Sequence, residues 1–209
     1  MAIFADRVAA GGELAESLAP WQGADSIVFG IPRGGVVVAA EVARILGLPL
    51  DVAVVRKLGA PSHEEFAVGA IAEGVRVVHP DAVRTGAVTP EQLASVEDLE
   101  RVELARRQQA FPRSGTDLRG RAAIVVDDGV ATGATAEAAC VSLRAEGPAR
   151  IILAVPVAPL SWQPASGVVD EFVCPHRVRD FWAVGQFYDD FTQTTDREVT
   201  RLLMRDLPD

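Results

Sequence analysis

Short apolar runs alternate with longer stretches of helical character along most of the chain. Residues 26–31 are apolar, and after Pro32 a glycine turn leads into a helical pattern over residues 36–46. Residues 50–55 form the next apolar run. Because parallel strands need a long crossover connection, the order strand, turn, helix, strand predicts a parallel pair joined by a helix.

The same alternation returns in the second half of the chain. A buried strand is expected over residues 121–126, a helix over residues 135–145 and another buried strand over residues 151–155. The remaining segments are a candidate sixth strand, an aromatic-rich stretch without a clear pattern and a closing helix: residues 168–173, 177–190 and 196–204. Strands that alternate with helices predict an α/β fold with a doubly wound, mostly parallel twisted sheet, whose ligand sites lie at the carboxyl ends of the strands.

A different pattern separates the two halves. Residues 59–66 lack periodicity and contain glycine, proline and serine, which predicts a loop. Residues 68–72 and 75–78 flank a Glu-Gly pair, so these two short runs are expected to form a hairpin.

A long helix is expected over residues 89–110. Thr89 is a candidate N-cap, Pro90 suits the first helical position, and Gln92 completes a capping box. The helix is expected to have one apolar stripe and one heavily charged face, given by Leu93, Val96, Leu99 or Glu100, Glu103, Leu104 and Arg107. This helical insertion, residues 89–111, is expected to pack on the sheet, on the C-terminal part of the chain or on another subunit.

The composition fits a globular chain of one domain. Of its 209 residues, 49% are hydrophobic and 23% are charged, which excludes a disordered, collagen-like or disulfide-rich chain. The longest apolar run, residues 151–160, contains two prolines, so no membrane span is expected. Cys140 and Cys174 lack the spacing of metal ligands, and two free thiols are typical of a cytoplasmic protein.

The charge of the chain narrows the choice of ligands. A net charge of −9 has the wrong sign for unspecific attraction to nucleic acid or to an anionic membrane, so any polyanionic ligand needs a local positive site. Lys57 is the one lysine, because every other basic residue is arginine. Coding bias is the simplest explanation of that count. A functional explanation would require Lys57 to lie at a ligand site.

The most informative segment is residues 124–135, IVVDDGVATGAT, where an apolar strand runs into Asp127 and Asp128. Small residues follow until a helix starts, so backbone N–H groups and the helix N-terminus can surround a phosphate, and Thr132 and Thr135 can add hydroxyl donors. Two carboxylates before such a loop suit the adjacent hydroxyls of a ribose. Neither GxxxxGK[ST] nor GxGxxG is present, and an ordinary strand-to-helix turn is the plain alternative.

This segment resembles the phosphoribosyl diphosphate (PRPP) signature of the type I phosphoribosyltransferases. The resemblance implies that Asp127 and Asp128 hold the ribose hydroxyls. It places the 5-phosphate of PRPP on Gly129, Val130, Ala131, Thr132, Gly133, Ala134 and Thr135.

Two further loops follow predicted strands and fit the same family. In GIPRGG, residues 30–35, a plain turn with a surface arginine is the alternative to an anion site. By the resemblance, the pyrophosphate group of PRPP contacts Arg33, Gly34, Gly35, Arg56 and Lys57. The loop expected over residues 59–66 would then be a lid that excludes water.

The C-terminal part resembles the hood of purine phosphoribosyltransferases, although a core cluster of aromatic residues is the alternative. The resemblance places Trp182 over the base, Val184 against it through backbone groups, and Asp189 at the base edge or near magnesium. Ala131 stands where enzymes for 6-oxopurines carry an aspartate, and no lysine follows position 57. Both departures argue against a 6-oxopurine base.

The resemblance implies an enzyme that transfers ribose 5-phosphate from PRPP to a purine-like nucleobase and releases pyrophosphate. Lys57, Asp127 and Asp128 would be catalytic, and Mg²⁺ carried by PRPP would contact Asp127, Asp128 and Asp189. No residue stands out as the general base, although Glu64, Glu65 and Glu73 are candidates. One domain is expected over residues 1–209, with a core over about 24–158 and a hood over about 159–194 that includes the N-terminal segment. A homo-oligomer is compatible with this organisation.

Two other functions are compatible with parts of this pattern. A regulatory or sensor protein that binds PRPP without transferring it has the same motif, since function lies in the site rather than the fold. A generic nucleotide-binding protein such as a kinase would need a Walker lysine, which this chain lacks.

Overall fold

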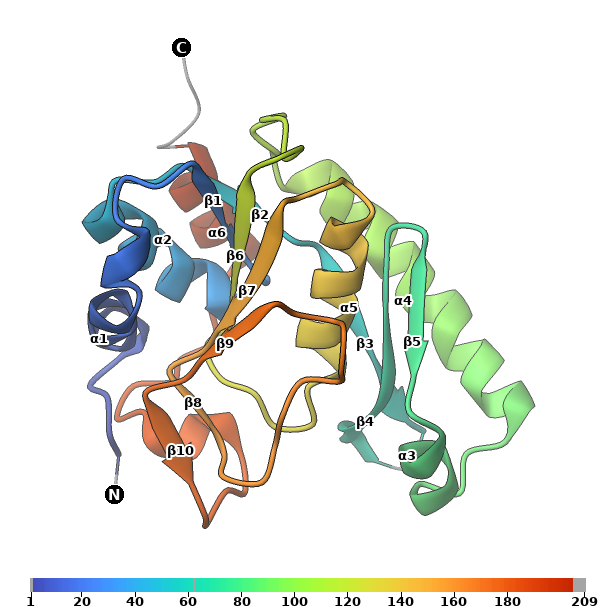
Figure 1. The fold of residues 1–209 in the computed structure, drawn as a ribbon. Coiled ribbons are helices and arrows are strands. Elements are labelled where there is room, and N and C mark those ends of the chain that lie inside the picture. The colour runs from blue at the N-terminus through green and yellow to red at the C-terminus, as the bar shows by residue number, and fades with distance from the viewer. Residues whose placement is uncertain (1, 62, 205–209) are drawn as a thin grey trace.

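A parallel sheet of five strands forms the centre of the computed structural model, which describes residues 2–61 and 63–204 (Figure 1). Its strand order is β2-β1-β6-β7-β9, and every neighbouring pair is parallel. The strands are β1 (Ser26–Gly30), β2 (Leu50–Val52), β6 (Ala122–Val126), β7 (Arg150–Ala154) and β9 (Glu171–Val173). The predicted parallel α/β sheet is confirmed, although β2 ends earlier than expected because the chain leaves this sheet after Val52.

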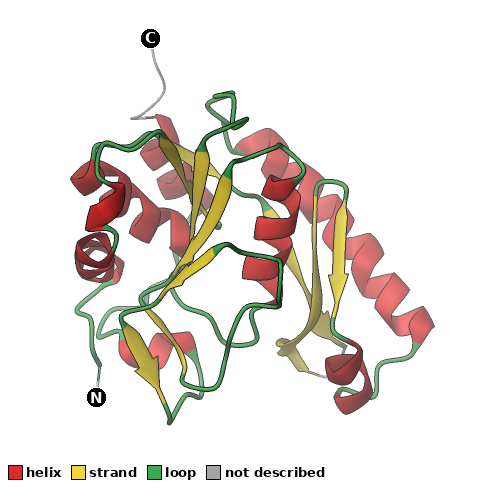
Figure 2. Cartoon of the chain, in the orientation of Figure 1, coloured by secondary structure: helices red, strands yellow, loops and turns green. Residues whose placement is uncertain are grey.

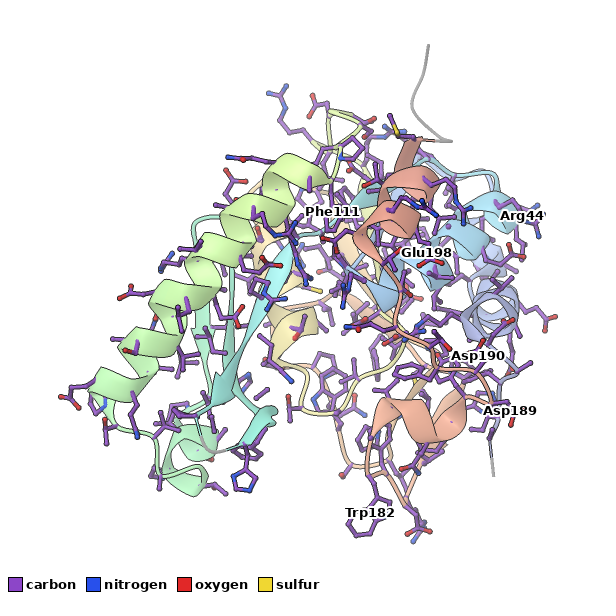
Figure 3. The ribbon with its side chains drawn as sticks, turned by 180° about the vertical axis from the view of Figure 1, so that it is seen from behind. Arg44, Phe111, Trp182, Asp189, Asp190 and Glu198 are labelled. Atoms are coloured by element: carbon purple, nitrogen blue, oxygen red, sulfur yellow. The ribbon has the colours of Figure 1, made fainter. Side chains whose placement is uncertain are left out.

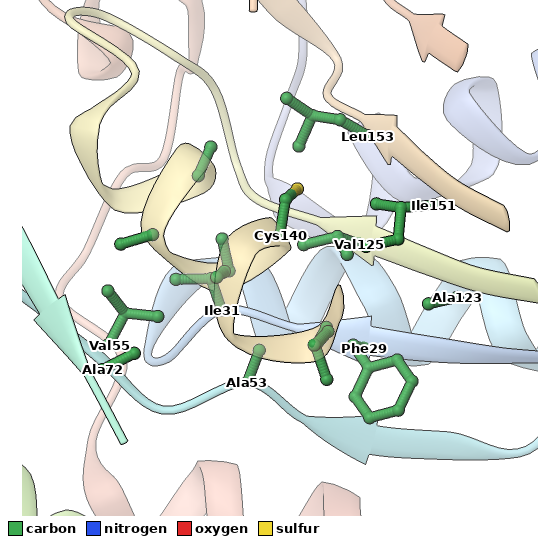
Figure 4. Packing of buried hydrophobic residues seen from close by; sticks show 14 of the residues in the cluster. Phe29, Ile31, Ala53, Val55, Ala72, Ala123, Val125, Cys140, Ile151 and Leu153 are labelled. Carbon is green, nitrogen blue, oxygen red and sulfur yellow. The ribbon is translucent and has the colours of Figure 1, made fainter. Parts of the chain in front are cut away.

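Helices cover both faces of the central sheet (Figure 2). Side chains alternate along the strands, so that Val28, Ile124 and Ile152 pack toward one set of helices. That set is α1 (Arg7–Ser17), α2 (Gly34–Leu46) and α6 (Asp196–Met204). On the opposite face, α5 (Ala134–Arg144) packs on Phe29, Val125 and Leu153, as Figure 4 shows. The expected helices over residues 36–46, 135–145 and 196–204 are confirmed.

Helix α1 has no counterpart among the predicted elements. Its sequence holds Gly11 and Gly12, which are poor helix formers, and few apolar residues mark a face. Packing explains the first glycine, because a Cβ at Gly11 would lie 2.8 Å from the Cβ of Glu41 on α2. Asp6 caps the helix by accepting a hydrogen bond from the Ala9 amide at 2.8 Å.

A second sheet is antiparallel and has the order β3-β4-β5. Its strands are β3 (Val55–Ala60), β4 (His63–Ala72) and β5 (Val75–Val78). The hairpin between β4 and β5 is confirmed, whereas the loop expected over residues 59–66 is wrong, since β3 and β4 continue through most of it. The reason is tertiary: Leu58, Ala60 and Val68 are buried, and strand pairing overrides the local glycine and proline signals. Ser62 and the side chains of Glu64 and Glu65 lie outside the described residues.

Helix α4 (Pro90–Ala110) covers this second sheet, with the short helix α3 (Pro80–Thr85) beside it. The capping box at Thr89 and Gln92 is confirmed, with the Thr89 amide donating to Gln92 at 2.9 Å. The apolar stripe is confirmed for Leu93 and Leu104 but wrong for Leu99, which is 72% exposed. Glu100 takes that position instead, because its carboxylate faces Arg56 of β3.

The hood is built from two short strands and a 3-10 helix. The strands β8 (Val157–Pro159) and β10 (His176–Val178) are parallel, and the helix is η2 (Val184–Phe187); a second 3-10 helix, η1 (Ala19–Trp21), follows α1. Phe4 forms a β-bridge with Tyr188, so the N-terminal segment lies beside η2. In the part of the chain that the structure describes, no helix is both long and apolar enough to cross a membrane.

Candidate functional site

Asp127 and Asp128 lie at the carboxyl end of β6, half-buried beneath the hood. The amide of Asp128 donates a hydrogen bond to Oδ1 of Asp127 at 2.9 Å. Burial raises the pKa of both carboxyls, and the negative charge of Asp128 raises the pKa of Asp127 further. Two adjacent carboxylates with little water around them are unfavourable unless positive or hydrogen-bonding groups approach.

Arg7 of α1 supplies that positive group, and no sequence motif indicates it because the contact spans 121 residues. Its Nε donates to Oδ2 of Asp128 at 2.7 Å, which works against the effect of burial on the pKa of Asp128. The same guanidinium lies 3.9 Å above the ring of Phe191 and donates to the Thr192 carbonyl at 2.9 Å. Tyr188 of the hood donates its hydroxyl to the Asp128 carbonyl. Arg7 and Tyr188 therefore connect the N-terminal helix and the hood to one acidic residue.

The loop from Gly129 to Thr135 runs from β6 into the N-terminus of α5. Gly133 is the N-cap of α5 and has φ +86°, a left-handed conformation that favours glycine. A Cβ there would also collide with the indole of Trp162, whose N–H donates to the Thr132 carbonyl at 3.1 Å. Trp162 thus holds the outside of this loop, another role that no motif indicated.

A cavity of about 520 Å³ brings most of the expected site residues together. Its walls are the acidic pair, the small-residue loop, two strands of the second sheet and the hood: Lys57, Ala67, Asp127, Asp128, Gly129 to Gly133, Thr135, Ala136, Trp182 to Gly185 and Phe191. Residues from β3, β4, the segment after β6, α5 and the hood thus meet in one space. Figure 3 shows the labelled Trp182 at the outer end of the hood, and its side chain is 90% exposed at the cavity rim. Asp189 is exposed and does not line the cavity; its amide donates to the Phe4 carbonyl.

Gly34 and Gly35 lie against the acidic pair at the start of α2. A Cβ at Gly34 would collide with Oδ2 of Asp128, and one at Gly35 would be 2.8 Å from the Cα of Asp127. The close packing of the start of α2 against the acidic pair therefore requires glycine at both positions, even without a ligand. Arg33 does not line the cavity, and its NH1 lies 3.5 Å from Oδ1 of Asp196 on α6.

Arg56 and Lys57 are consecutive on β3 and take different surroundings, as successive strand residues do. The Nε of Arg56 donates to Oε2 of Glu100 on α4 at 2.5 Å. Lys57 lines the cavity beside the acidic pair. Of the two, Lys57 is therefore the residue placed to meet a ligand there.

The donor set fits magnesium that arrives with a phosphorylated ligand. Mg²⁺ is commonly held by one or two carboxylates together with substrate phosphates and water. Asp127 and Asp128 supply two carboxylates at the cavity. No group of three or more histidine, cysteine or acidic residues suitable for a metal occurs among the described residues.

Comparisons with known proteins agree with this geometry. Residues 6–192 match the family model described as phosphoribosyl transferase domain. Two Mycobacterium tuberculosis proteins, provisionally named phosphoribosyl transferases, are 49% identical over 210 residues, covering 98% of this chain and 47% of theirs. The chain thus spans about half the length of these curated relatives.

Two solved structures are similar to this chain in fold. A protein of Thermus thermophilus has 42% sequence identity and a TM-score of 0.72, with each chain covered over 100% of its length. A Neisseria gonorrhoeae protein with bound ppGpp has 17% identity and a TM-score of 0.51, covering 95% of this chain and 92% of its own. The second likeness concerns the fold alone.

Proposed function

This chain belongs to the phosphoribosyl transferase family, and on that premise we propose that it transfers ribose 5-phosphate from PRPP to a purine-like nucleobase and releases pyrophosphate. The observation that carries the proposal is the cavity in which the acidic pair, the small-residue loop and Lys57 meet. Each part has a chemical counterpart in PRPP: two hydroxyls, a monophosphate and a diphosphate.

The ribose 5-phosphate occupies the loop from Gly129 to Thr135. Backbone N–H groups at the N-terminus of α5 and the hydroxyls of Thr132 and Thr135 are donors for the phosphate, and the helix dipole favours its negative charge. Asp127 and Asp128 accept hydrogen bonds from the two ribose hydroxyls. Together these contacts fix the sugar, so that its reacting carbon faces the open part of the cavity.

The reaction needs stabilisation of charge rather than a covalent intermediate. As the bond to pyrophosphate breaks, the sugar gains positive character, which the nearby carboxylates favour. Lys57 faces the leaving pyrophosphate. Mg²⁺ bound with PRPP would neutralise part of the charge on the pyrophosphate, and Asp127 and Asp128 are the residues that would hold it.

The base lies between the loop and the hood. Val184 lines the cavity and packs against the loop, since a Cβ on Gly129 would be 2.6 Å from its Cγ1. Trp182 at the rim offers an exposed aromatic face on which a planar base can stack. Ala131 lines the cavity and adds no charged group for a 6-oxo or ring N–H group, so a purine-like base without a 6-oxo group fits best.

Titration of the protein with PRPP in the presence of Mg²⁺, followed by calorimetry, tests whether the protein binds PRPP as proposed. The wild-type protein is expected to bind, and Asp127→Asn combined with Asp128→Asn is expected to lose binding while circular dichroism stays unchanged. No heat at millimolar PRPP, or full affinity in the double variant, would overturn the proposed site. Binding without base-dependent release of pyrophosphate would support a non-catalytic sensor instead.

A further inference from the structure

The outer face of α4 carries two large apolar side chains that the fold leaves exposed. Leu99 and Val102 are each 72% exposed, and among the large apolar residues that the structure describes only Trp182 is more exposed. They lie three residues apart on one helix, so they are neighbours on its surface. The inner face of α4 packs on the second sheet through Leu93 and Leu104. Helix α4 therefore has two apolar faces, and in the described chain the outer one is left uncovered, as Figure 3 shows.

A groove of about 330 Å³ lies beside Leu99 and Val102, between α4 and the end of β3. Its walls come from α4, from β3 and from the turn after β3: Val96, Leu99, Glu100, Arg56, Lys57 and Gly59 to Pro61. An exposed apolar ridge and an open groove thus lie side by side on one surface. Two copies of such a surface can each place a side chain in the groove of the other, which is what a self-complementary contact around a two-fold axis requires.

The exposed charges of α4 are balanced, whereas the whole chain carries a net charge of −9. They are Glu91, Asp98, Arg101 and Arg106, two of each sign. In an antiparallel contact of two α4 helices centred on Leu99, residues equally far from Leu99 on its two sides lie level with each other. Asp98 of one copy then lies within one residue of Arg101 of the other, about 1.5 Å along the helix. Glu91 and Arg106 match in the same way, so opposite charges meet at both places.

The uncharged residues of the outer face match in the same arrangement. Val102 of one copy lies within one residue of Ser95 of the other, so a larger side chain meets a small one. Ala94 and Ala105, both exposed, come level to within one residue as well. Small residues at these positions allow the two helices to approach closely.

We propose that the outer face of α4 is the contact between two copies of this chain, with Leu99 of each copy in the groove of the other. The partner is a second copy rather than a different protein, because the ridge, the groove and both signs of charge occur together on one face. Helix α4 has 21 residues, so it offers a contact about 32 Å long and about 10 Å wide. Because a standard interface buries about 800 Å² per partner, this smaller face is expected to give a dimer with a Kd in the micromolar range. The pairing gives the helical insertion a role beyond covering the second sheet.

The contact adjoins the candidate catalytic site, and this part of the inference rests on the proposed function. Lys57 lines both the groove and the ligand cavity. A second copy in the groove packs on β3 and on the turn after it, and so holds the strand that presents Lys57 to the pyrophosphate. Pairing is therefore expected to lower the KM for PRPP.

Sedimentation equilibrium of the wild-type chain from about 1 µM to about 100 µM tests the pairing, because the dimer should form within this range. Val102→Glu places a charge in the contact and should weaken the pairing at least about thirtyfold, as loss of a central contact does. Its circular dichroism should equal that of the wild type, since Val102 is exposed. Ile45→Glu is the matched control, because it puts the same charge on an exposed apolar residue of α2 and should dimerise like the wild type. A wild-type monomer at about 100 µM, or unchanged pairing in Val102→Glu, would overturn the proposal.

Exchange of two charges tests the antiparallel arrangement. Asp98→Arg and Arg101→Asp should each weaken the pairing several-fold, because like charges then face each other across the contact. The two substitutions combined exchange the charges and should restore most of the affinity. A double variant that pairs no better than either single variant would overturn this arrangement.

The failure of the pairing and the failure of the proposed function give different results. Dimers that dissociate in Val102→Glu, without transferase activity in any variant, would support the pairing and contradict only the proposed transfer. Transferase activity in a wild-type chain that stays monomeric would overturn only the pairing. In an active enzyme, Val102→Glu should raise the KM for PRPP several-fold, and an unchanged KM would overturn the link between the groove and Lys57.

Discussion

Arg7→Gln is the substitution that tests most sharply how the acidic pair is maintained. Arg7 and Asp128 form an ion pair at 2.7 Å, with side-chain exposures of 11% and 15%. Glutamine keeps polar atoms in the place of the guanidinium but removes its charge. Asp128 is then a carboxylate beside Asp127 without a cationic partner.

The expected magnitude follows from this burial. Breaking a buried ion pair costs about 3–5 kcal/mol, and the residual exposure of this pair places the cost below that range. Asp128 reduces the cost by binding a proton. Because burial already raises its pKa and Arg7 opposes that rise, loss of Arg7 raises the pKa further. A protonated Asp128 is a weaker acceptor for a ribose hydroxyl, and a charge-assisted hydrogen bond contributes about 1.5–3 kcal/mol, so PRPP is expected to bind roughly 10- to 100-fold more weakly near pH 7.

Titration of the wild-type protein and of Arg7→Gln with PRPP in the presence of Mg²⁺, followed by calorimetry between pH 6 and pH 9, measures this loss of affinity. The deficit of Arg7→Gln should shrink as the pH rises, since Asp128 then loses its proton in the variant as well. Arg44→Gln is the control, because Arg44 is an exposed arginine of α2 that pairs with Glu41. Equal affinity and an unchanged pH profile in Arg7→Gln would refute the role of Arg7.

Three other substitutions give independent tests. Asp127→Asn should abolish PRPP binding yet raise the Tm of the unliganded protein by about 2–4 °C at pH 8, equivalent to about 1 kcal/mol. A carboxyl whose pKa is raised in the folded state destabilises the fold as the pH rises through that pKa, so the gain in Tm should be smaller at pH 5. A lower Tm of the variant at pH 8 would contradict this expectation. Gly133→Ala should weaken PRPP binding because the added Cβ meets Trp162. Trp162→Ala combined with Gly133→Ala should restore only part of the affinity, because the left-handed φ of residue 133 remains. Full restoration in the double variant would rule out backbone strain. Lys57→Arg should lower kcat about tenfold, because a planar guanidinium replaces a compact ammonium without a change of charge. Wild-type kinetics in this variant would mean that coding bias explains the single lysine.

The central sheet and its helices could be predicted because their signals are local. Each buried strand is a short apolar run, and the carboxyl ends of parallel strands meet at one edge. The acidic pair at residues 127 and 128 and the glycines at 34 and 35 follow two such strands, so their sequence positions alone place them near one another. The motif at residues 124–135 likewise pointed to the family that the comparisons show.

The parts that sequence could not predict depend on contacts distant along the chain. Arg7 reaches Asp128 across 121 residues, and nothing around Arg7 distinguishes it from any other arginine of a helix N-terminus. The loop expected over residues 59–66 is mostly strand because burial of Leu58 and Val68 outweighs local turn signals. Leu99 fits the helical period but faces solvent, since Glu100 is held by Arg56 on β3.

Release of pyrophosphate from PRPP in the presence of Mg²⁺ and single nucleobases is the most direct measurement of the proposed activity. Release is expected only when a suitable base is present, at a rate that saturates with both substrates and disappears in Asp127→Asn combined with Asp128→Asn. The matching nucleoside monophosphate should appear in equal amount. No release above background with any purine or pyrimidine base, although PRPP binds, would contradict the proposed transfer.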